Sequence, residues 1–93
     1  MKTVVTTPPV DIALRTLDPD SVRKVHAWFD NLKNWENDAT VRKNSQALEG
    51  VPDVYVLRTT TDIRIFFTIE GERITILDIA KKPAILTSGQ LIG

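Results

Sequence analysis

The stretch that decides the fold runs from residue 48 to residue 82 and reads LEGVPDVYVLRTTTDIRIFFTIEGERITILDIAKK. It contains three runs rich in β-branched and aromatic residues, and such runs are typical of strands. We expect strands at about 53–59, 62–70 and 73–80. Glu70-Gly71 is predicted to form the turn between the last two, because glycine supplies the positive φ of a tight hairpin. The stretch therefore predicts a three-stranded antiparallel meander.

The predicted turn also sets a register for the last hairpin. It pairs Phe67 with Ile74 and Ile65 with Ile76, which places these side chains together on one face, as in a core. Arg64 then lies on the opposite face. In this register Arg64 is expected opposite Leu77, beside Phe66 and Thr75.

The loop before Arg64 decides how Arg58 is oriented. If the loop of threonines and Asp62 has about three residues, Arg58 and Arg64 face the same way, and if it has about two they do not. The interpretation preferred here is the longer loop, which places both arginines on one face.

The N-terminal half predicts a strand and two helices. Residues 1–9 are expected to be a tail stopped by two prolines, and 10–17 to be a strand because Val10, Ile12 and Leu14 alternate. Asp18-Pro19 predicts the start of a helix over 19–33, and Asp38 the start of a second helix over about 39–48. The short connector favours an antiparallel helical hairpin. The fold class expected is α+β, with an N-terminal strand, the hairpin and the meander.

Composition bounds what the protein can do. Its 93 residues are expected to form one domain over 1–93, and it has no cysteine, so disulfides and thiolate chemistry are excluded. The N-terminus lacks the apolar core of a signal peptide and no run is long enough to span a membrane, so a cytoplasmic protein is expected. Twelve basic and twelve acidic residues cancel. Any basic site must therefore be a local patch.

In the order of its elements and in several motifs, the chain resembles the RelE/ParE toxin superfamily of bacterial type II toxin–antitoxin systems. The resemblance covers about residues 10–82. It is carried by Leu48-x-Gly50-x-Pro52-Asp53-x-Tyr55, Leu57-Arg58, Ile63-Arg64-Ile65-Phe66-Phe67, Ile74-Thr75-Ile76-Leu77 and Ala80-Lys81-Lys82.

The resemblance implies an activity, a partner and a set of site residues. RelE-like members cleave messenger RNA in the ribosomal A site without a metal or cofactor, ParE-like members inhibit DNA gyrase, and both are held inactive by an antitoxin. Carried over to this chain, Arg64 and Arg58 are the candidate catalytic cations. The candidate substrate-binding residues are Lys81, Lys82 and Tyr55. The expected partners are a cognate antitoxin and, for an active enzyme, the ribosome and its message, with a homodimer as an option when no antitoxin is bound.

Two departures from the family pattern keep three interpretations open. Val56 stands where a lysine can sit, and no tyrosine, histidine or arginine follows Lys82, where a residue that assists proton transfer is common. The RelE-like ribonuclease is preferred. The alternatives are a ParE-like gyrase inhibitor and an inactive member that only binds its antitoxin.

The chemistry also has to be weighed against simpler roles. Attack of a 2′-OH on the next phosphate needs a base, an acid and a cation for the developing charge, and a guanidinium suits the last role. Arg64 can instead be a surface cation paired with Asp78 or Glu70, and Tyr55 a core residue. The lysine pair can simply solubilise a strand end, and His26 is expected to face solvent. Apolar residues beyond the last strand are expected either to pack on the sheet or to contact the antitoxin, namely Ile85, Leu86, Leu91 and Ile92.

Overall fold

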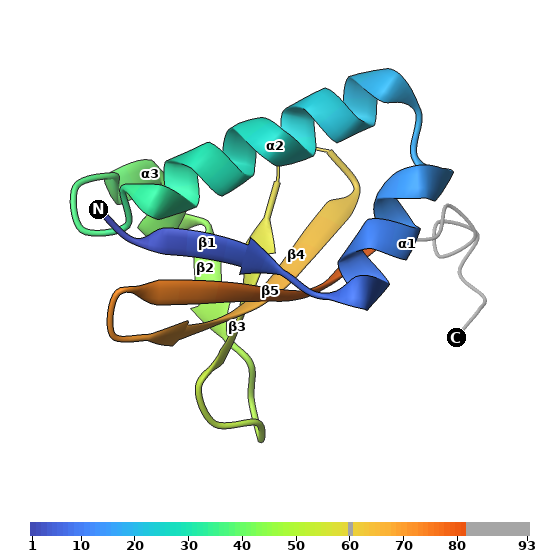
Figure 1. Cartoon of the computed structure of the whole chain (residues 1–93). Helices are drawn as coiled ribbons and strands as arrows, with labels where there is room; N and C mark the ends of the chain where they lie inside the picture. The colour runs from blue at the N-terminus through green and yellow to red at the C-terminus, as the bar shows by residue number, and fades with distance from the viewer. Residues whose placement is uncertain (60, 82–93) are drawn as a thin grey trace.

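The computed structural model describes residues 1–59 and 61–81. In this part of the chain a short strand comes first, three helices follow, and four strands complete the order (Figure 1). The elements are β1 (Thr3–Thr6), α1 (Pro8–Thr16), α2 (Pro19–Lys33), α3 (Ala39–Lys43), β2 (Ser45–Ala47), β3 (Val54–Arg58), β4 (Ile63–Glu70) and β5 (Arg73–Lys81). None of the described helices has the length and apolarity that crossing a membrane requires.

The strands form one five-stranded sheet in the order β1-β5-β4-β3-β2. The last four strands pair antiparallel, whereas β1 pairs with β5 in parallel. The sheet is strongly twisted, so that β1 and β5 run across the direction of β2 and β3 (Figure 1). The predicted α+β class, with its antiparallel meander, is confirmed.

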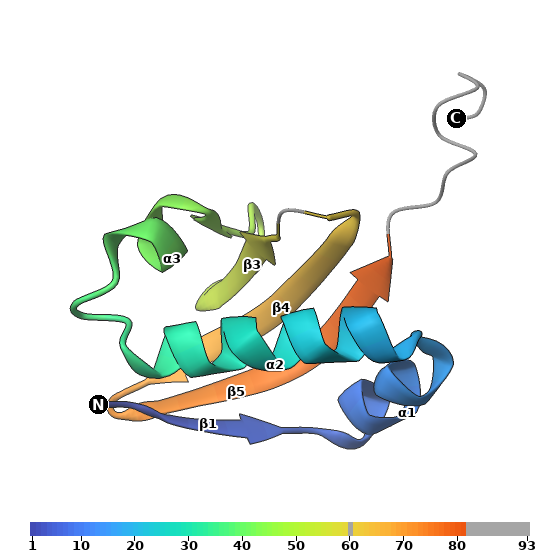
Figure 2. The ribbon, with the colours of Figure 1, turned by 90° about the horizontal axis from the view of Figure 1, so that it is seen from above.

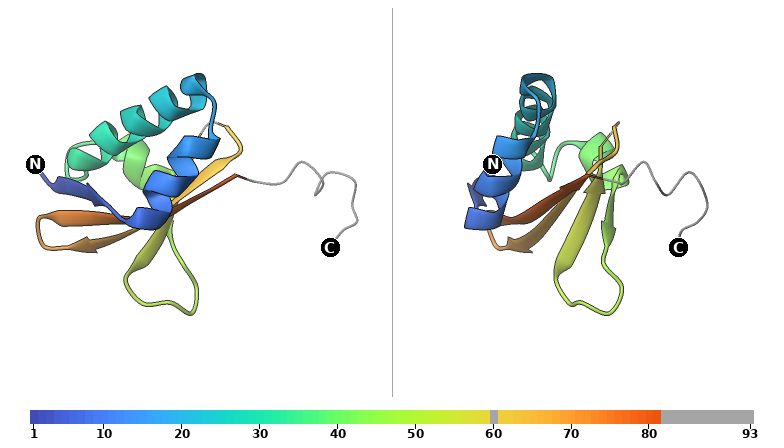
Figure 3. Two further views of the ribbon diagram at one scale, coloured as in Figure 1. Left: turned by 45° about the vertical axis from the view of Figure 1, so that its right-hand side comes forward. Right: turned by 90° about the vertical axis from the view of Figure 1, so that its right-hand side faces the viewer.

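One face of the sheet carries the core and the described helices. Alternate residues of β4, namely Ile63, Ile65 and Phe67, are almost completely buried there. Each helix adds residues to the same core, with Val10 from α1, Val41 from α3, and Val25, Phe29 and Leu32 from α2. Figures 2 and 3 show the two longer helices gathered on this side. No described helix covers the opposite face, which carries the intervening residues of β4.

The first elements differ from the prediction. Residues 1–9 are not a tail, because Thr3–Thr6 forms β1, and 10–17 is not a strand, because Pro8–Thr16 forms α1. Prolines at the start of a helix are tolerated, since the N–H groups there have no partner in the helix. Val10 is buried, and Ala13, Leu14 and Leu17 pack against the core. This spacing of three, four and seven residues belongs to a helix and outweighs the short alternation.

The predicted helix over 19–33 is confirmed with both of its ends. Asp18 caps α2 as predicted, because its carboxylate accepts hydrogen bonds from the Ser21 hydroxyl at 2.7 Å and from the Ser21 N–H at 3.3 Å. These two bonds lower the pKa of Asp18. The cap and the proline that follows it thus fix where the longest helix begins.

The second predicted helix is wrong in its C-terminal half. Asp38 does cap α3, accepting from the Val41 N–H at 3.1 Å, but α3 has only five residues. Residues 45–47 instead form β2, which pairs with β3. Two further hydrogen bonds extend this pairing. The Arg58 N–H donates to the Asn44 carbonyl, and the Leu48 N–H donates to the Val54 carbonyl. Hydrogen bonds to a neighbouring strand therefore override a local helical pattern that was short to begin with.

The register of the last hairpin also differs. Glu70 pairs with Arg73, so the turn is Gly71-Glu72 rather than Glu70-Gly71, and the positive φ of 59° lies at Gly71. Phe67 therefore pairs with Ile76 rather than with Ile74. A bulge between Phe66 and Phe67 shifts the rest of the ladder, which pairs Ile65 with Ile79 and Arg64 with Ala80 instead of Leu77. The predicted core face is nevertheless correct.

Lys2 links three segments at the N-terminal end of the sheet. Its side chain is only 8% exposed, and its Nζ donates to the Gly71 carbonyl at 2.7 Å and lies 2.8 Å from a Glu36 carboxylate oxygen. The Lys2 N–H donates to the carbonyl of Lys33, the last residue of α2. The hydrogen bond with Glu36 raises the pKa of Lys2 and lowers that of Glu36. We call this arrangement the Lys2 clasp.

Candidate functional site

Arg58 and Arg64 lie directly opposite each other on neighbouring strands. Residues opposite each other in an antiparallel pair share a face, so both arginines belong to the face that no described helix covers, as the longer loop predicted. The Arg58 N–H donates to Asn44, on the side of β2, at 2.9 Å. Its backbone groups therefore point away from β4, which makes this a non-hydrogen-bonded pair, the type with the closer side chains. We call these two residues the arginine pair.

The arginine pair carries two positive charges without a described counter-ion. None of the ion pairs found in residues 1–59 and 61–81 includes Arg58 or Arg64, so the predicted alternative of a pair with Asp78 or Glu70 is not seen. Asp78 instead accepts from the Ile79 N–H at 2.8 Å. Like charges directly opposite each other in a sheet destabilise it. Their arrangement suits a bound anion, because a guanidinium can hold a phosphate through two parallel hydrogen bonds.

A row of three cross-strand neighbours lies next to the arginine pair on the same face. It consists of Val56, Phe66 and Asp78, opposite one another on β3, β4 and β5. Val56 and Phe66 are half-buried and Asp78 is exposed. The sequence contains a signal for this row, because Phe66 is out of phase with the buried residues Ile65 and Phe67. The site predictions did not include Phe66 or Asp78.

Tyr55 lies on the other face of the sheet. It is opposite Phe67 on β4, and the two rings stack with centroids 5.5 Å apart and an interplanar angle of 16°. Trp35 meets both rings edge-on at 5.9 Å. These contacts fit the core-packing alternative, and they separate Tyr55 from the arginine pair.

Lys81 is not brought to the arginine pair either. It is opposite Ile63, a buried residue of the helix side, and so belongs to that side of the sheet. There its charge adds to the lowering of the pKa of Asp18 that the hydrogen bonds from Ser21 cause. The predictions for Lys82 and for Ile85, Leu86, Leu91 and Ile92 fall outside the described residues.

His26 is exposed on α2, as predicted, and its ring meets Phe29 edge-on with centroids 5.6 Å apart. It lies on the helix side of the molecule and not beside the arginine pair. In the described part of the chain, no three His, Cys, Asp or Glu side chains come together as metal ligands would.

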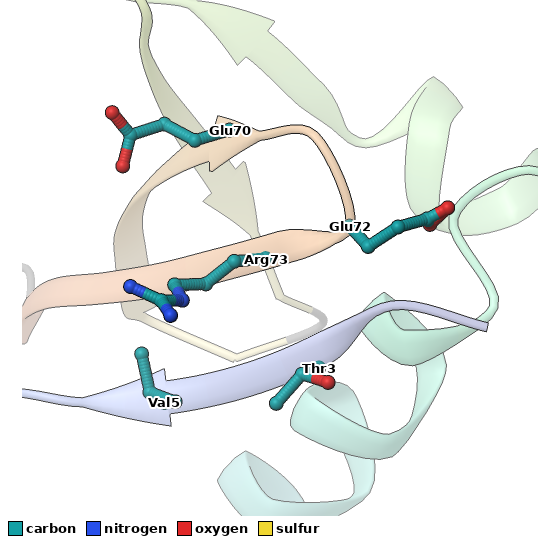
Figure 4. A pocket seen from close by; sticks show the side chains of 5 residues that line it. All are labelled: Thr3, Val5, Glu70, Glu72 and Arg73. Atoms are coloured by element: carbon teal, nitrogen blue, oxygen red, sulfur yellow. The ribbon is translucent and has the colours of Figure 1, made fainter.

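A hollow of about 410 Å³ lies at the other end of the sheet. It is lined by Thr3, Val5, Glu70, Glu72 and Arg73, and Figure 4 shows Arg73 over Val5 while the two glutamates point apart. Glu70 ends β4, whereas Arg64 lies near its beginning. The hollow therefore belongs to a different region from the arginine pair. Its mixed charges and separated carboxylates do not assemble a chemical site.

Comparison with known proteins gives a match in structure but not in sequence. No protein-family model matches the chain, and no curated protein matches it either. The isolated RelE toxin of E. coli is similar with a TM-score of 0.71 and 11% identity, over 95% of this chain and 94% of that one. The RelE–RelB complex of the archaeon Pyrococcus horikoshii OT3 gives 0.68 and 22%, over 89% and 97%. The YoeB dimer of Staphylococcus aureus gives 0.63 and 16%, over 88% and 97%. The chain therefore has the fold of the RelE toxins.

Proposed function

We propose that this protein is the toxin of a type II toxin–antitoxin system and that it cleaves messenger RNA on the ribosome. The fold supports the first part of the proposal. The arginine pair supports the second, since two guanidinium groups that form no ion pair with a described residue are suited to a phosphate of single-stranded RNA. The Arg64 guanidinium makes one long hydrogen bond, to the Ile63 carbonyl at 3.5 Å. The arginine pair is the single observation that carries the ribonuclease part of the proposal.

The proposed reaction is attack of a ribose 2′-OH on the adjacent phosphate. Negative charge grows on the phosphate oxygens as the new P–O bond forms and the bond to the leaving oxygen breaks. Arg64 and Arg58 are assigned the stabilisation of this charge. On the face that carries them, the described residues include no histidine or tyrosine. Charge stabilisation is therefore the role proposed for this part of the chain. Tyr55 and Lys81 lie on the other side of the sheet and are not included in the proposed site, whereas Lys82 remains a predicted substrate contact.

A small antitoxin is the proposed partner. The structures with a similar fold include RelE bound to RelB from E. coli and from P. horikoshii. In this chain the arginine pair, with Arg58 exposed and Arg64 half-buried, lies on the face that no described helix covers, so a partner bound there would block access of RNA. A homodimer is proposed as the state without antitoxin, as the YoeB structure from S. aureus is a dimer.

Expression of the wild type and of Arg64→Ala, followed by mapping of cuts in translated messages, tests the proposal. We expect the wild type to stop growth and cut messages. Arg64→Ala should cut them about 10²–10³-fold more slowly, the usual loss on removing one group that stabilises transition-state charge. Arg73→Ala is the matched control, because Arg73 is exposed on β5 but pairs opposite Glu70, far along the strand from Arg64. If the wild type cuts no message, the ribonuclease proposal is wrong.

One observation favours a second candidate, a protein that binds an antitoxin without catalysis. It is the lack of a histidine or tyrosine beside the arginine pair in the part of the chain described. Harmless expression together with co-purification of a small protein encoded beside this gene would select this candidate. DNA damage with intact messages would instead indicate inhibition of gyrase.

A further inference from the structure

Phe66 is a large aromatic residue on the face of the sheet that has no described helix. It lies beside the arginine pair, in the row with Val56 and Asp78. Among the described residues it belongs neither to the buried core nor to the aromatic pairs formed by His26, Phe29, Trp35, Tyr55 and Phe67. It is half-buried, so part of the residue is left uncovered by the rest of the described structure.

The position of this ring relative to the arginine pair is specific. Phe66 follows Arg64 by two residues on the same face of β4, a separation of about 6.6–6.8 Å along a strand. Arg58 is its diagonal neighbour on β3, at about 7–8 Å. A flat apolar surface thus lies next to two cations. A nucleotide has the complementary arrangement, with an anionic phosphate on one side of its sugar and a flat base on the other.

We propose that Phe66 is the platform on which a base of single-stranded RNA stacks, next to the phosphate that Arg58 and Arg64 hold. This inference rests on the proposed function and adds to it the group that binds the base. Stacking on exposed aromatic side chains of a sheet is a common way for proteins to bind unpaired bases.

Asp78 gives this platform a base preference. It is opposite Phe66 and exposed, and while one of its carboxylate oxygens accepts from Ile79, no described residue donates to the other. A carboxylate accepts hydrogen bonds only, and so it prefers a base edge that carries amino groups. Guanine offers two neighbouring donors, whereas the donor of uracil lies between two carbonyl oxygens. Guanine is therefore the preferred base on Phe66, and uracil is disfavoured.

Binding of short unstructured RNA oligonucleotides that carry 2-aminopurine, whose fluorescence is quenched on stacking, tests the proposal. Phe66→Leu should weaken binding about 5- to 150-fold, the range for loss of one stacked base, and should remove the protein-dependent quenching. Phe66→Tyr should retain both. Phe29→Leu is the matched control, since Phe29 is a buried residue of α2 on the helix side. It should lower the melting temperature and leave the affinity unchanged.

The outcomes separate the two proposals. If Arg64→Ala weakens binding but Phe66→Leu changes neither affinity nor quenching, the ring packs only against protein and the stacking proposal is wrong, while the proposed function stands. If the wild type binds none of these oligonucleotides, the stacking proposal fails, while the proposed function is decided by the cutting of translated messages. Asp78→Asn should reduce the preference for guanine over uracil oligonucleotides. Equal binding of the two by the wild type would overturn the role of Asp78.

Discussion

Arg58 and Arg64 bring two like charges together on neighbouring strands, and this has an energetic consequence within the folded protein. Like charges opposite each other repel, and no described acid neutralises either of them. Such an arrangement lowers the stability of the free protein and is relieved when an anion binds. The same two side chains are therefore expected to favour ligand binding at the expense of stability.

Replacing one of the two charges should stabilise the fold. We expect Arg64→Gln to raise the free energy of unfolding by about 0.2–1 kcal/mol, measured by urea denaturation at low salt, with a smaller gain at high salt because exposed charges are screened. Arg73→Gln provides the contrast. Arg73 lies opposite Glu70, so its loss removes an attraction and should not stabilise the protein. A decrease in stability on Arg64→Gln would show that the pair is not repulsive.

The face of each site residue could be predicted from the sequence only where the alternation is regular. Ile63, Ile65 and Phe67 alternate strictly, and this placed Arg64 correctly on the other face. Its cross-strand partner was wrong for two reasons. The turn is Gly71-Glu72 rather than Glu70-Gly71, which moves the partner from Leu77 to Ile79, and the bulge next to Phe67 adds one residue to β5, which moves it to Ala80. Lys81 lies beyond this bulge, so its side of the sheet could not be predicted either.

Among the elements, the Lys2 clasp connects β1, the turn between β4 and β5, and the end of α2. Glu36 has a lowered pKa because it accepts a hydrogen bond from Lys2. Its contribution to stability is therefore present above its ordinary pKa of 4.5 and is lost as the pH falls through the lowered value. Lys2 has a raised pKa, so its contribution is present below 10.5 and is lost as the pH rises through the raised value.

Glu36→Gln tests the acid side of this dependence. We expect the variant to be less stable than the wild type at about pH 7, and to lose less further stability between about pH 5 and about pH 2, since the titrating group is gone. Melting temperatures across this range measure the effect. Glu49→Gln, a change at an exposed glutamate between β2 and β3, should behave like the wild type. Parallel curves for the wild type and Glu36→Gln would contradict the role of the clasp.

The elements that sequence analysis predicted are those with local end signals. Asp18-Pro19 marks the start of α2, and both its bounds were right. The segment that begins at Val10 has no such signal and was predicted wrongly. Its apolar residues alternate as in a strand over 10–14, but over 10–17 they have the spacing of a helix. Residues 45–47 became β2 since β3 offers them hydrogen bonds, and pairing of this kind depends on the tertiary structure.

For the whole molecule, the balance of charge limits how RNA can be held. With twelve basic and twelve acidic residues, the protein has no general attraction for a polyanion. Binding should therefore depend on a few local contacts. This is what the proposed function requires, since a substrate presented by the ribosome is positioned largely by the larger particle.

The salt dependence of binding to a single-stranded oligonucleotide measures the number of these contacts. If only Arg58 and Arg64 neutralise phosphates, the slope of log K against log salt should be about −1.4. The double variant Arg58→Ala/Arg64→Ala should bring the slope close to zero. Fluorescence anisotropy between about 50 and 200 mM salt covers the useful range. A slope several times steeper would indicate a larger basic surface than the arginine pair.

The parallel pairing of β1 with β5 has a consequence for how the protein is made. Thr3 is synthesised well before its partner Arg73 and the rest of β5, which are separated from it by all the other described elements. During translation, β1 and β4 both wait with an unpaired edge until β5 leaves the exit tunnel and fills the place between them. A nascent chain stalled before β5 would thus expose two open edges, which makes it a target for chaperones and for aggregation.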